Sequence, residues 1–350
     1  MYKKFFMGIA AMAALTLVSC SSEDLNSLSD NSSKNEAISF DGYLGRSAVS
    51  VNGSRGSVLE KKQLQESEEG FGVFGNYSSI VGATPTYGDN WFKNQKVTYS
   101  TSNSTSTKWA YTNTKYWPTE GHIDFLAYAP YDKNQNLTNN SKLNFIVSST
   151  VTDQKDLLWA NAANKTKADN PVKFTFNHAL AKIGYTVKTS VADAGTTIML
   201  NKITLAGSDD GTQKAFYPNG IIDLSTGVWT PSKTDEKLKF EWFTTTSGTK
   251  LTTTAADNAG NYLFVIPQNF SASATDKLYV IVEYTINYNN SGVITTMTNT
   301  VSKQIKMNFL QGKAYTINLT IGLTPIEFDA AVTDWVDAKN PNNDIPVTWN

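Results

Sequence analysis

Residues 278–292 read LYVIVEYTINYNNSG, and the spacing of apolar side chains in this stretch decides the fold class of the chain. From Leu278 to Tyr288 every second residue is apolar or aromatic, which is the pattern of a β-strand with one buried face. The next four residues, 289–292, are typical of a tight turn. We therefore expect a partner strand to begin near Val293 and to complete an antiparallel hairpin.

The same two-residue period recurs elsewhere, whereas long helical periodicity is scarce. It marks strands at residues 38–44, 172–176, 183–187, 262–266 and 315–321. Residues 58–67 are a candidate short helix, and residues 160–167 are a candidate short helix or loop. Many strands with turn signals between them predict an all-β protein with two antiparallel β-sandwich domains. We place the boundary between the domains at Asn177-His178.

Composition and charge exclude several classes of protein. The 350 residues include 30 basic and 31 acidic side chains, and the pI is about 6.2, so there is no excess of positive charge to bind a nucleic acid. Only 17% of the residues are charged and 12% are aromatic, which suits a packed β-protein. The chain has one cysteine, Cys20, so it contains no internal disulfide and packing must hold the fold.

The N-terminal residues have the three regions of an export signal. Residues 1–4 carry positive charge, residues 5–18 are apolar, and the small residue Ser19 precedes Cys20. The apolar run is too short to span a bilayer as a helix. Attachment of lipid to Cys20 would explain a lone thiol in an exported protein. An ordinary secretory signal with a stray cysteine is the alternative.

Arg46 and Arg55 are the only arginines in the chain, and both follow the first predicted strand. Small residues flank Arg46, which favours an exposed loop that a protease can cut. A protease specific for arginine would cut between Arg46 and Ser47, or between Arg55 and Gly56, and would leave everything downstream whole. The alternative is that the chain prefers lysine and that the two arginines stand there by chance.

Other motif matches lack the context that their chemistry requires. Residues 70–75 fit GxGxxG but are strand-like and precede no amphipathic helix, so we expect no dinucleotide cofactor. The DDG sequence at 209–211 lacks the alternating ligands of a calcium loop and is expected to be a turn. His122 and His178, the only histidines, stand far apart in sequence and predict no metal site. The sequence contains no catalytic motif, so we predict that the protein is not an enzyme.

Two other functions remain open from the residues alone. Trp91, Trp109 and Trp117 are candidates for binding glycans in a surface lipoprotein, although aromatic rings more often fill a core. Asp153 and Asp156 are candidates for the paired carboxylates of a glycosidase, but their spacing gives this hypothesis no support.

The order of several short motifs resembles the fimbrillins, the Bacteroidales proteins that polymerise into type V pili. The motifs are LVSC at 17–20, which resembles the bacterial lipobox, the strand at 37–44 followed by Arg46, FGVFG at 71–75, YWP at 116–118, residues 123–130, DLL at 156–158, FNHALAKI at 176–183, VIPQ at 265–268, GKAY at 312–315 and VTDW at 332–335. Members of this family have two transthyretin-like β-sandwich domains and are exported as lipoproteins. A protease cuts them after an arginine behind the first strand, and the C-terminal segment of another subunit fills the groove that this strand leaves.

For this chain the resemblance implies a defined organisation. Residues 1–19 are the signal peptide, 20–36 a lipidated flexible tether, 37–46 a strand removed on maturation, 47–178 the N-terminal sandwich, and 179–350 the C-terminal sandwich with a donor tail at about 326–350. Removal of the first strand would take Ile38, Phe40 and Leu44 out of the N-terminal sandwich. An extended, alternately apolar strand must replace these side chains.

The tail offers two such segments, and we expect both to contribute to the donor strand. Their alternating residues are Ile326, Phe328, Ala330 and Val332 in the first segment and Ile345, Val347 and Trp349 in the second. The alternative for the first segment is the last strand of the C-terminal sandwich.

The resemblance therefore predicts a structural pilus subunit, of the stalk kind because both the arginine and the apolar tail are present. Its expected partners are other copies of itself or related anchor and tip subunits, an arginine-specific protease, and the outer membrane through lipid before maturation. The mature protein would lie in a cell-surface fimbrium. A tip or accessory adhesin and a surface-anchored glycan-binding lipoprotein are the alternatives.

Overall fold

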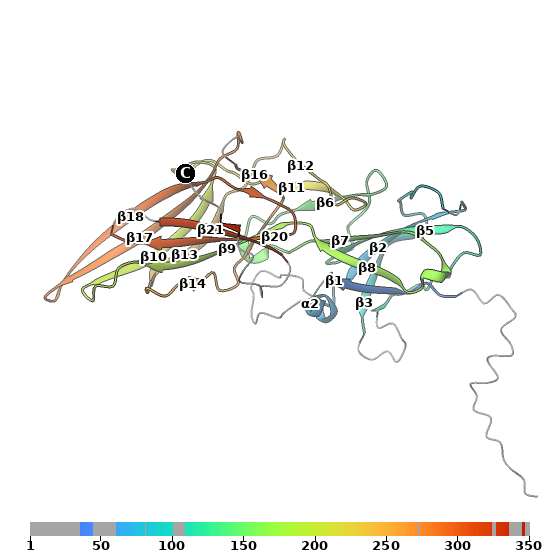
Figure 1. Cartoon of the computed structure of the whole chain (residues 1–350), viewed down its shortest axis with the longest axis horizontal. Coiled ribbons are helices and arrows are strands. Elements are labelled where there is room, and N and C mark those ends of the chain that lie inside the picture. The colour runs from blue at the N-terminus through green and yellow to red at the C-terminus, as the bar shows by residue number, and fades with distance from the viewer. Residues whose placement is uncertain are drawn as a thin grey trace, which may run out of the picture. The chain divides into compact units, whose positions relative to one another are not determined.

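The computed structural model describes residues 36–44, 61–80, 82–100, 109–271, 274–323, 327–335 and 345–346. Those from Ala37 onward belong to one compact unit. Nearly all regular structure in these ranges is β-strand in mainly antiparallel sheets, which confirms the predicted all-β class (Figure 1). None of the helices described is long and apolar enough to cross a membrane.

Seven strands from the N-terminal half of the chain form one sheet. In spatial order they are β1 (Phe40–Leu44), β8 (Val172–His178), β7 (Leu158–Lys165), β5 (His122–Ala129), β2 (Phe71–Ser78), β3 (Phe92–Tyr99) and β4 (Trp109–Ala110). Neighbouring strands are antiparallel except β1 and β8, which run parallel. Figure 1 shows β1, in dark blue, lying along β8. β1 is thus an edge strand that has one neighbour in its sheet.

The helix and loop predictions near this sheet have different outcomes. The short helix α2 (Lys61–Glu66) falls within the predicted helix at 58–67. The prediction of a helix or loop at 160–167 is wrong, because residues up to Lys165 belong to β7, and the short 3-10 helix η2 (Lys167–Asp169) follows. The buried face of β7 includes the small side chains of Ala160 and Ala162, which made its two-residue period hard to detect.

Two further sheets come from the C-terminal half. One has the order β14 (Ala256–Asp257), β9 (Ala181–Thr189), β20 (Lys313–Ile321), β21 (Glu327–Asp334) and β22 (Ile345–Pro346), with β15 (Leu263–Val265) also paired to β9. The other has the order β13 (Phe240–Lys250), β10 (Thr196–Ala206), β17 (Leu278–Asn290) and β18 (Val293–Ile305). β17 and β18 confirm the predicted hairpin, and Ser291 and Gly292 between them have positive φ values of 53° and 93°.

The remaining strands are short. β6 (Lys142–Ile146), β11 (Asn219–Asp223) and β12 (Trp229–Pro231) form a three-stranded sheet, β16 (Gln268–Asn269) pairs with β19 (Asn308–Phe309), and η1 (Val151–Asp153) is a 3-10 turn. Since β6 pairs with β11, a segment of the predicted N-terminal domain shares a sheet with a segment of the predicted C-terminal domain.

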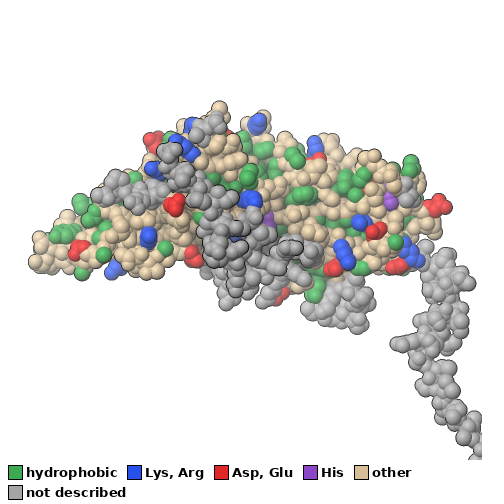
Figure 2. All heavy atoms as spheres, in the orientation of Figure 1, with side chains coloured by type: hydrophobic (Ala, Val, Ile, Leu, Met, Phe, Trp, Pro, Cys, Tyr) green, Lys and Arg blue, Asp and Glu red, His purple; other side chains and the backbone are tan. Residues whose placement is uncertain are grey.

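Two hydrophobic clusters form the core of the unit. The first draws its buried residues from positions 38–176, and the second from positions 74–335. β5 contributes to both, because Phe125 and Ala127 belong to the first cluster and Leu126 and Tyr128 to the second. The domain boundary after His178 stays a prediction. On the face shown in Figure 2 acidic and basic side chains are scattered, in keeping with the balanced net charge.

Candidate functional site

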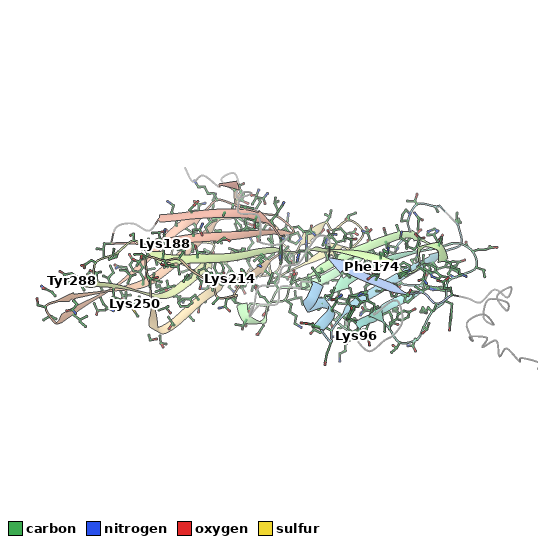
Figure 3. The ribbon with its side chains drawn as sticks, turned by 60° about the horizontal axis from the view of Figure 1, so that its bottom comes forward. Lys96, Phe174, Lys188, Lys214, Lys250 and Tyr288 are labelled. Carbon is green, nitrogen blue, oxygen red and sulfur yellow. The ribbon has the colours of Figure 1, made fainter. Side chains whose placement is uncertain are left out.

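β1 buries its apolar side chains in the first hydrophobic cluster. Ile38, just before the strand, is 1% exposed, and Phe40 is fully buried. The Phe40 ring centroid lies 5.5 Å from that of Phe92, 5.4 Å from Tyr111, 5.6 Å from Phe125 and 5.8 Å from Phe174. Figure 3 labels Phe174, which projects from β8 next to β1. Ile38 and Phe40 thus fill a groove that the rest of the cluster leaves open.

The backbone of this segment is bonded on two sides. β1 pairs with β8 from Phe40 opposite Val172 to Leu44 opposite Phe176. On the other side Ala37 forms a β-bridge with Tyr116, and the Ile38 N–H donates to the Lys115 carbonyl at 2.8 Å. The segment 37–44 is therefore inserted between β8 and residues 115–116.

Two polar side chains also hold this segment in place. The amide oxygen of Asn170 accepts hydrogen bonds from the Ser39 N–H at 2.9 Å and the Ser39 hydroxyl at 3.0 Å, and its Nδ2 donates to the Ala37 carbonyl at 3.0 Å. The Tyr111 hydroxyl donates to the Ile38 carbonyl at 2.8 Å. Sequence reasoning missed both residues, because nothing in the local sequence of either one points to a strand so distant along the chain.

Gly42 in β1 lies close to three aromatic rings. A Cβ atom added there would lie 3.1 Å from the Phe71 ring, 3.4 Å from the Phe176 ring and 3.6 Å from the Trp109 ring. A larger side chain at this position would therefore require these rings to shift.

The C-terminal strand β21 lies in another sheet. It pairs with β20 over eight residues, from Thr320 opposite Glu327 to Lys313 opposite Asp334. Ala330 is 2% exposed, and Val332 packs against the second cluster. β22 adds a short pairing to the outer edge of β21, with Val332 opposite Ile345 and Ala331 opposite Pro346. β21 thus occupies the place of a last strand, which was the alternative for this segment.

Trp335 anchors the end of β21. Its ring stacks on His178 with centroids 3.8 Å apart and planes 8° apart, and it stacks on Phe264 at 5.7 Å. The backbone N–H of Trp335 donates to the Gly312 carbonyl at 3.0 Å. The Nδ1 atom of His178 lies 2.7 Å from the buried Asp156 carboxylate. These contacts fix the point from which the chain continues towards its C-terminal residues.

Several predicted site residues lie outside the described residues. They are Cys20, Arg46, Ser47, Arg55, Gly56, Ile326, Val347 and Trp349. For Leu44, Phe328 and Ile345 the backbone pairing is described, and their side chains are not. Their predicted roles in lipidation, cleavage and strand exchange stay predictions.

The other motifs have structural roles. Residues 71–75 of the GxGxxG match lie in β2. Asp210 lies in a turn, where hydrogen bonds from the Ser208 hydroxyl and from Thr212 lower its pKa to about 2. Within the described ranges no group of three or more metal-ligating side chains comes together. Asp153 is exposed, whereas Asp156 is buried against His178.

The tryptophans proposed for glycan binding belong to the core. Trp109 is 5% exposed and Trp117 is 3% exposed in the first cluster, and Trp91 packs against that cluster. Trp109 and Trp117 therefore present no open aromatic platform, as expected for rings that fill a core.

Comparison with known proteins identifies relatives of this chain. A family model described as fimbrillin-like matches residues 59–335. A fimbrial protein from Bacteroides vulgatus has a similar solved structure over 86% of this chain and 100% of its own, with 22% sequence identity and a TM-score of 0.69. This likeness shows that the two proteins share a fold.

Two weaker structural matches carry related descriptions. A putative cell adhesion protein from Bacteroides uniformis is 19% identical over 86% of this chain and 99% of its own, with a TM-score of 0.49. The tip fimbrial protein of Porphyromonas gingivalis with a C-terminal truncation is 10% identical. It matches 76% of this chain and 99% of its own, with a TM-score of 0.36. No curated protein matches the chain.

Proposed function

Because the chain belongs to the fimbrillin-like family, we propose that it is a stalk subunit of a type V pilus that polymerises by donor-strand exchange. The precursor is exported and held in the outer membrane by lipid on Cys20. Cleavage after Arg46 removes β1, and the tail of another subunit takes its place. The partners are further copies of this chain or related anchor and tip subunits, together with an arginine-specific protease.

The observation that carries this proposal is the way β1 is held. It is an edge strand, so it can leave without breaking a ladder between two other strands of the sheet. Its departure would expose the cavity filled by Ile38 and Phe40, whose burial stabilises the fold by about 1.5–3 kcal/mol each. It would also remove the hydrogen bonds that Asn170 and Tyr111 make to residues 37–39 and would open the edge of β8, which favours capture of another strand.

The two segments of the tail, a first half at 326–332 and a second half at 345–349, differ in how easily they can leave their own subunit. Residues 326–329 read IEFD, similar to ISFD at 38–41, which makes the first half a plausible donor by sequence. However, β21 is fully paired with β20 and anchored by Trp335, so its departure would open the second cluster. β22 is held by two residue pairs. We therefore assign the exchange to the second half, with Ile345, Val347 and Trp349. In this proposal β21 stays paired with β20 in its own subunit.

The same cut has a second consequence. Cys20 precedes Arg46 in the chain, so one cleavage separates the lipid anchor from the body and opens the groove. Assembly and release from the membrane would then begin together.

An arginine-specific protease tests this proposal on the unlipidated precursor that starts at Ser21. We expect one stable product that begins at Ser47, followed by multimers that resist detergent. Arg46→Ala should abolish both, whereas the matched variant Arg55→Ala should leave both unchanged. A product that begins at Gly56 would move the cut to Arg55, and a trimmed protein that stays monomeric would contradict donor-strand exchange.

A further inference from the structure

A cavity of about 760 Å³ lies apart from the β1 groove, between the loop at 130–136, strand β6 and the side chains of Glu69 and Lys155. Its volume is in the range of small-molecule sites, about 300–1,000 Å³. The buried residues Tyr128 and Leu157 that line it belong to the second cluster, whereas β1 fills a groove in the first. The cavity is therefore a separate site.

The loop that forms one wall is fixed by hydrogen bonds. The Tyr128 hydroxyl lies 2.8 Å from both the Asn94 Oδ1 atom and the Asp132 carbonyl oxygen. Asn94 Nδ2 donates to the carbonyls of Asp132 and Gln135, each at 2.9 Å, and the Asn134 N–H donates to Asp132 Oδ1 at 2.9 Å. Burial raises the pKa of Tyr128, so its hydroxyl stays protonated. A wall that is ordered in advance lowers the entropy lost on binding a ligand.

The cavity combines open amide groups with aromatic rings. Gln135 Nε2 donates to the Asn144 carbonyl at 3.0 Å and joins the loop to β6. The side-chain amides of Asn134 and Asn144 are exposed and bond to no other group in the described part of the chain. The half-buried rings of Tyr131 and Phe145 line the same space. Lys96, labelled in Figure 3, places its ammonium 5.5 Å from the Tyr131 ring centroid.

The charges around the cavity balance. Its ionic lining consists of Glu69, Asp132, Lys133 and Lys155. Glu69 and Lys155 form an ion pair at 2.8 Å, which leaves one acid and one base. The residues that line the cavity therefore offer a phosphate or other anion no excess of positive charge, and the nearby Lys96 ammonium lies against the Tyr131 ring. An apolar ligand would bury the amides of Asn134 and Asn144 without partners, which costs free energy.

We propose that this cavity binds a neutral oligosaccharide of pyranose sugars. The amides of Asn134 and Asn144 and the second carboxylate oxygen of Asp132 would bond sugar hydroxyls, because amides and carboxylates donate to or accept from such groups. The ring of Tyr131 would pack against the C–H face of a sugar. This role goes beyond assembly, since nothing in strand exchange uses these residues.

Calorimetric titration of the unlipidated precursor tests this site with maltohexaose, xylohexaose and mannohexaose, and with hexagalacturonic acid as the anionic probe. We expect at least one neutral hexasaccharide to bind, and Tyr131→Ala and Asn144→Ala each to weaken its binding about tenfold. Tyr288→Ala, which alters an exposed tyrosine on β17, is the matched control and should bind like the unaltered protein.

Three results would overturn the proposal: no neutral hexasaccharide binds, the anionic probe binds as tightly, or both cavity variants bind normally while folded as judged by circular dichroism. The result is independent of pilus assembly. After trimming, Tyr131→Ala should still form multimers, so a failure of sugar binding and a failure of strand exchange can be told apart.

Discussion

At the scale of single residues, Phe40 is the side chain that most firmly holds β1 in the first cluster. It is fully buried, and four aromatic rings lie within 6 Å of its centroid. In the uncut precursor Phe40→Ala should lower the free energy of unfolding by about 3–5 kcal/mol, because it removes these contacts and leaves a cavity. Denaturant unfolding followed by fluorescence measures this loss.

The matched control for Phe40→Ala is Ile294→Ala, which truncates an apolar side chain that is 66% exposed on β18. Its effect should stay within about 0.5 kcal/mol. Equal effects of the two variants would show that β1 contributes no more to stability than a surface strand does.

Asn170 should control how readily β1 opens. Asn170→Ala removes the hydrogen bonds to the Ser39 N–H and the Ala37 carbonyl, both part-buried, and should lower the free energy of unfolding by about 0.5–1.5 kcal/mol for each bond. Hydrogen exchange of the amides at 38–44 should therefore become faster in the precursor. The control is Asn177→Ala, since that exposed amide bonds only to the nearby Thr175 carbonyl. Unchanged exchange in Asn170→Ala would mean that the β8 ladder and the bonds of Ile38 to Tyr111 and Lys115 hold the strand without Asn170.

At the scale of strands, the period of two along the chain predicts which residues face a core but not which strands become neighbours. The hairpin at 278–305 was predictable because its partners are adjacent in sequence and joined by a tight turn. The strand at 38–44 was predictable too, yet its parallel pairing with β8 and its bond to Asn170 join residues about 130 positions apart. β7 was missed because Ala160 and Ala162 give its buried face little hydrophobic signal.

The same limit applies to the C-terminal strand. Alternation at 326–332 fits a donor strand and a resident last strand equally well, and only the pairing of β21 with β20 distinguishes them. The VTDW motif indicated a resemblance, but the stacking of Trp335 on His178 depends on a tertiary contact between the end of β21 and the end of β8.

Trp335 should be the residue that keeps β21 docked. It is 8% exposed and stacks on both His178 and Phe264. Trp335→Ala should destabilise the fold by about 3–5 kcal/mol and should speed hydrogen exchange at 327–334 more than at the β17 and β18 amides. Tyr288→Ala, which removes a ring that is 46% exposed, serves as the control. If exchange in β21 does not change, the β20 ladder and not the tryptophan anchors the strand.

At the scale of the whole molecule, assembly requires a subunit whose groove opens and whose tail leaves while both cores stay intact. The groove belongs to the first cluster, and β21 packs against the second. Removal of β1 would therefore disturb the first cluster, whereas β21 and Trp335 could stay docked on the second. In the proposed strand exchange, this separation would let one subunit act as acceptor and donor at once.

Deleting residues 344–350 tests this arrangement directly. The deletion removes Ile345, Val347 and Trp349, and among the described residues it takes two residue pairs from the edge of β21. The free energy of unfolding of the precursor should therefore change by no more than about 0.5 kcal/mol. After trimming, the shortened subunit keeps an open groove and lacks a donor, so alone it should stay monomeric.

Mixed with the trimmed full chain, it should cap growing multimers and shorten them, as measured by detergent-resistant ladders on gels. Thr348→Ser, which keeps the alternating apolar residues, is the control and should assemble normally. If the deleted chain still forms long multimers, the donor is the first half of the tail at 326–332, and β21 must leave β20 in spite of its anchor.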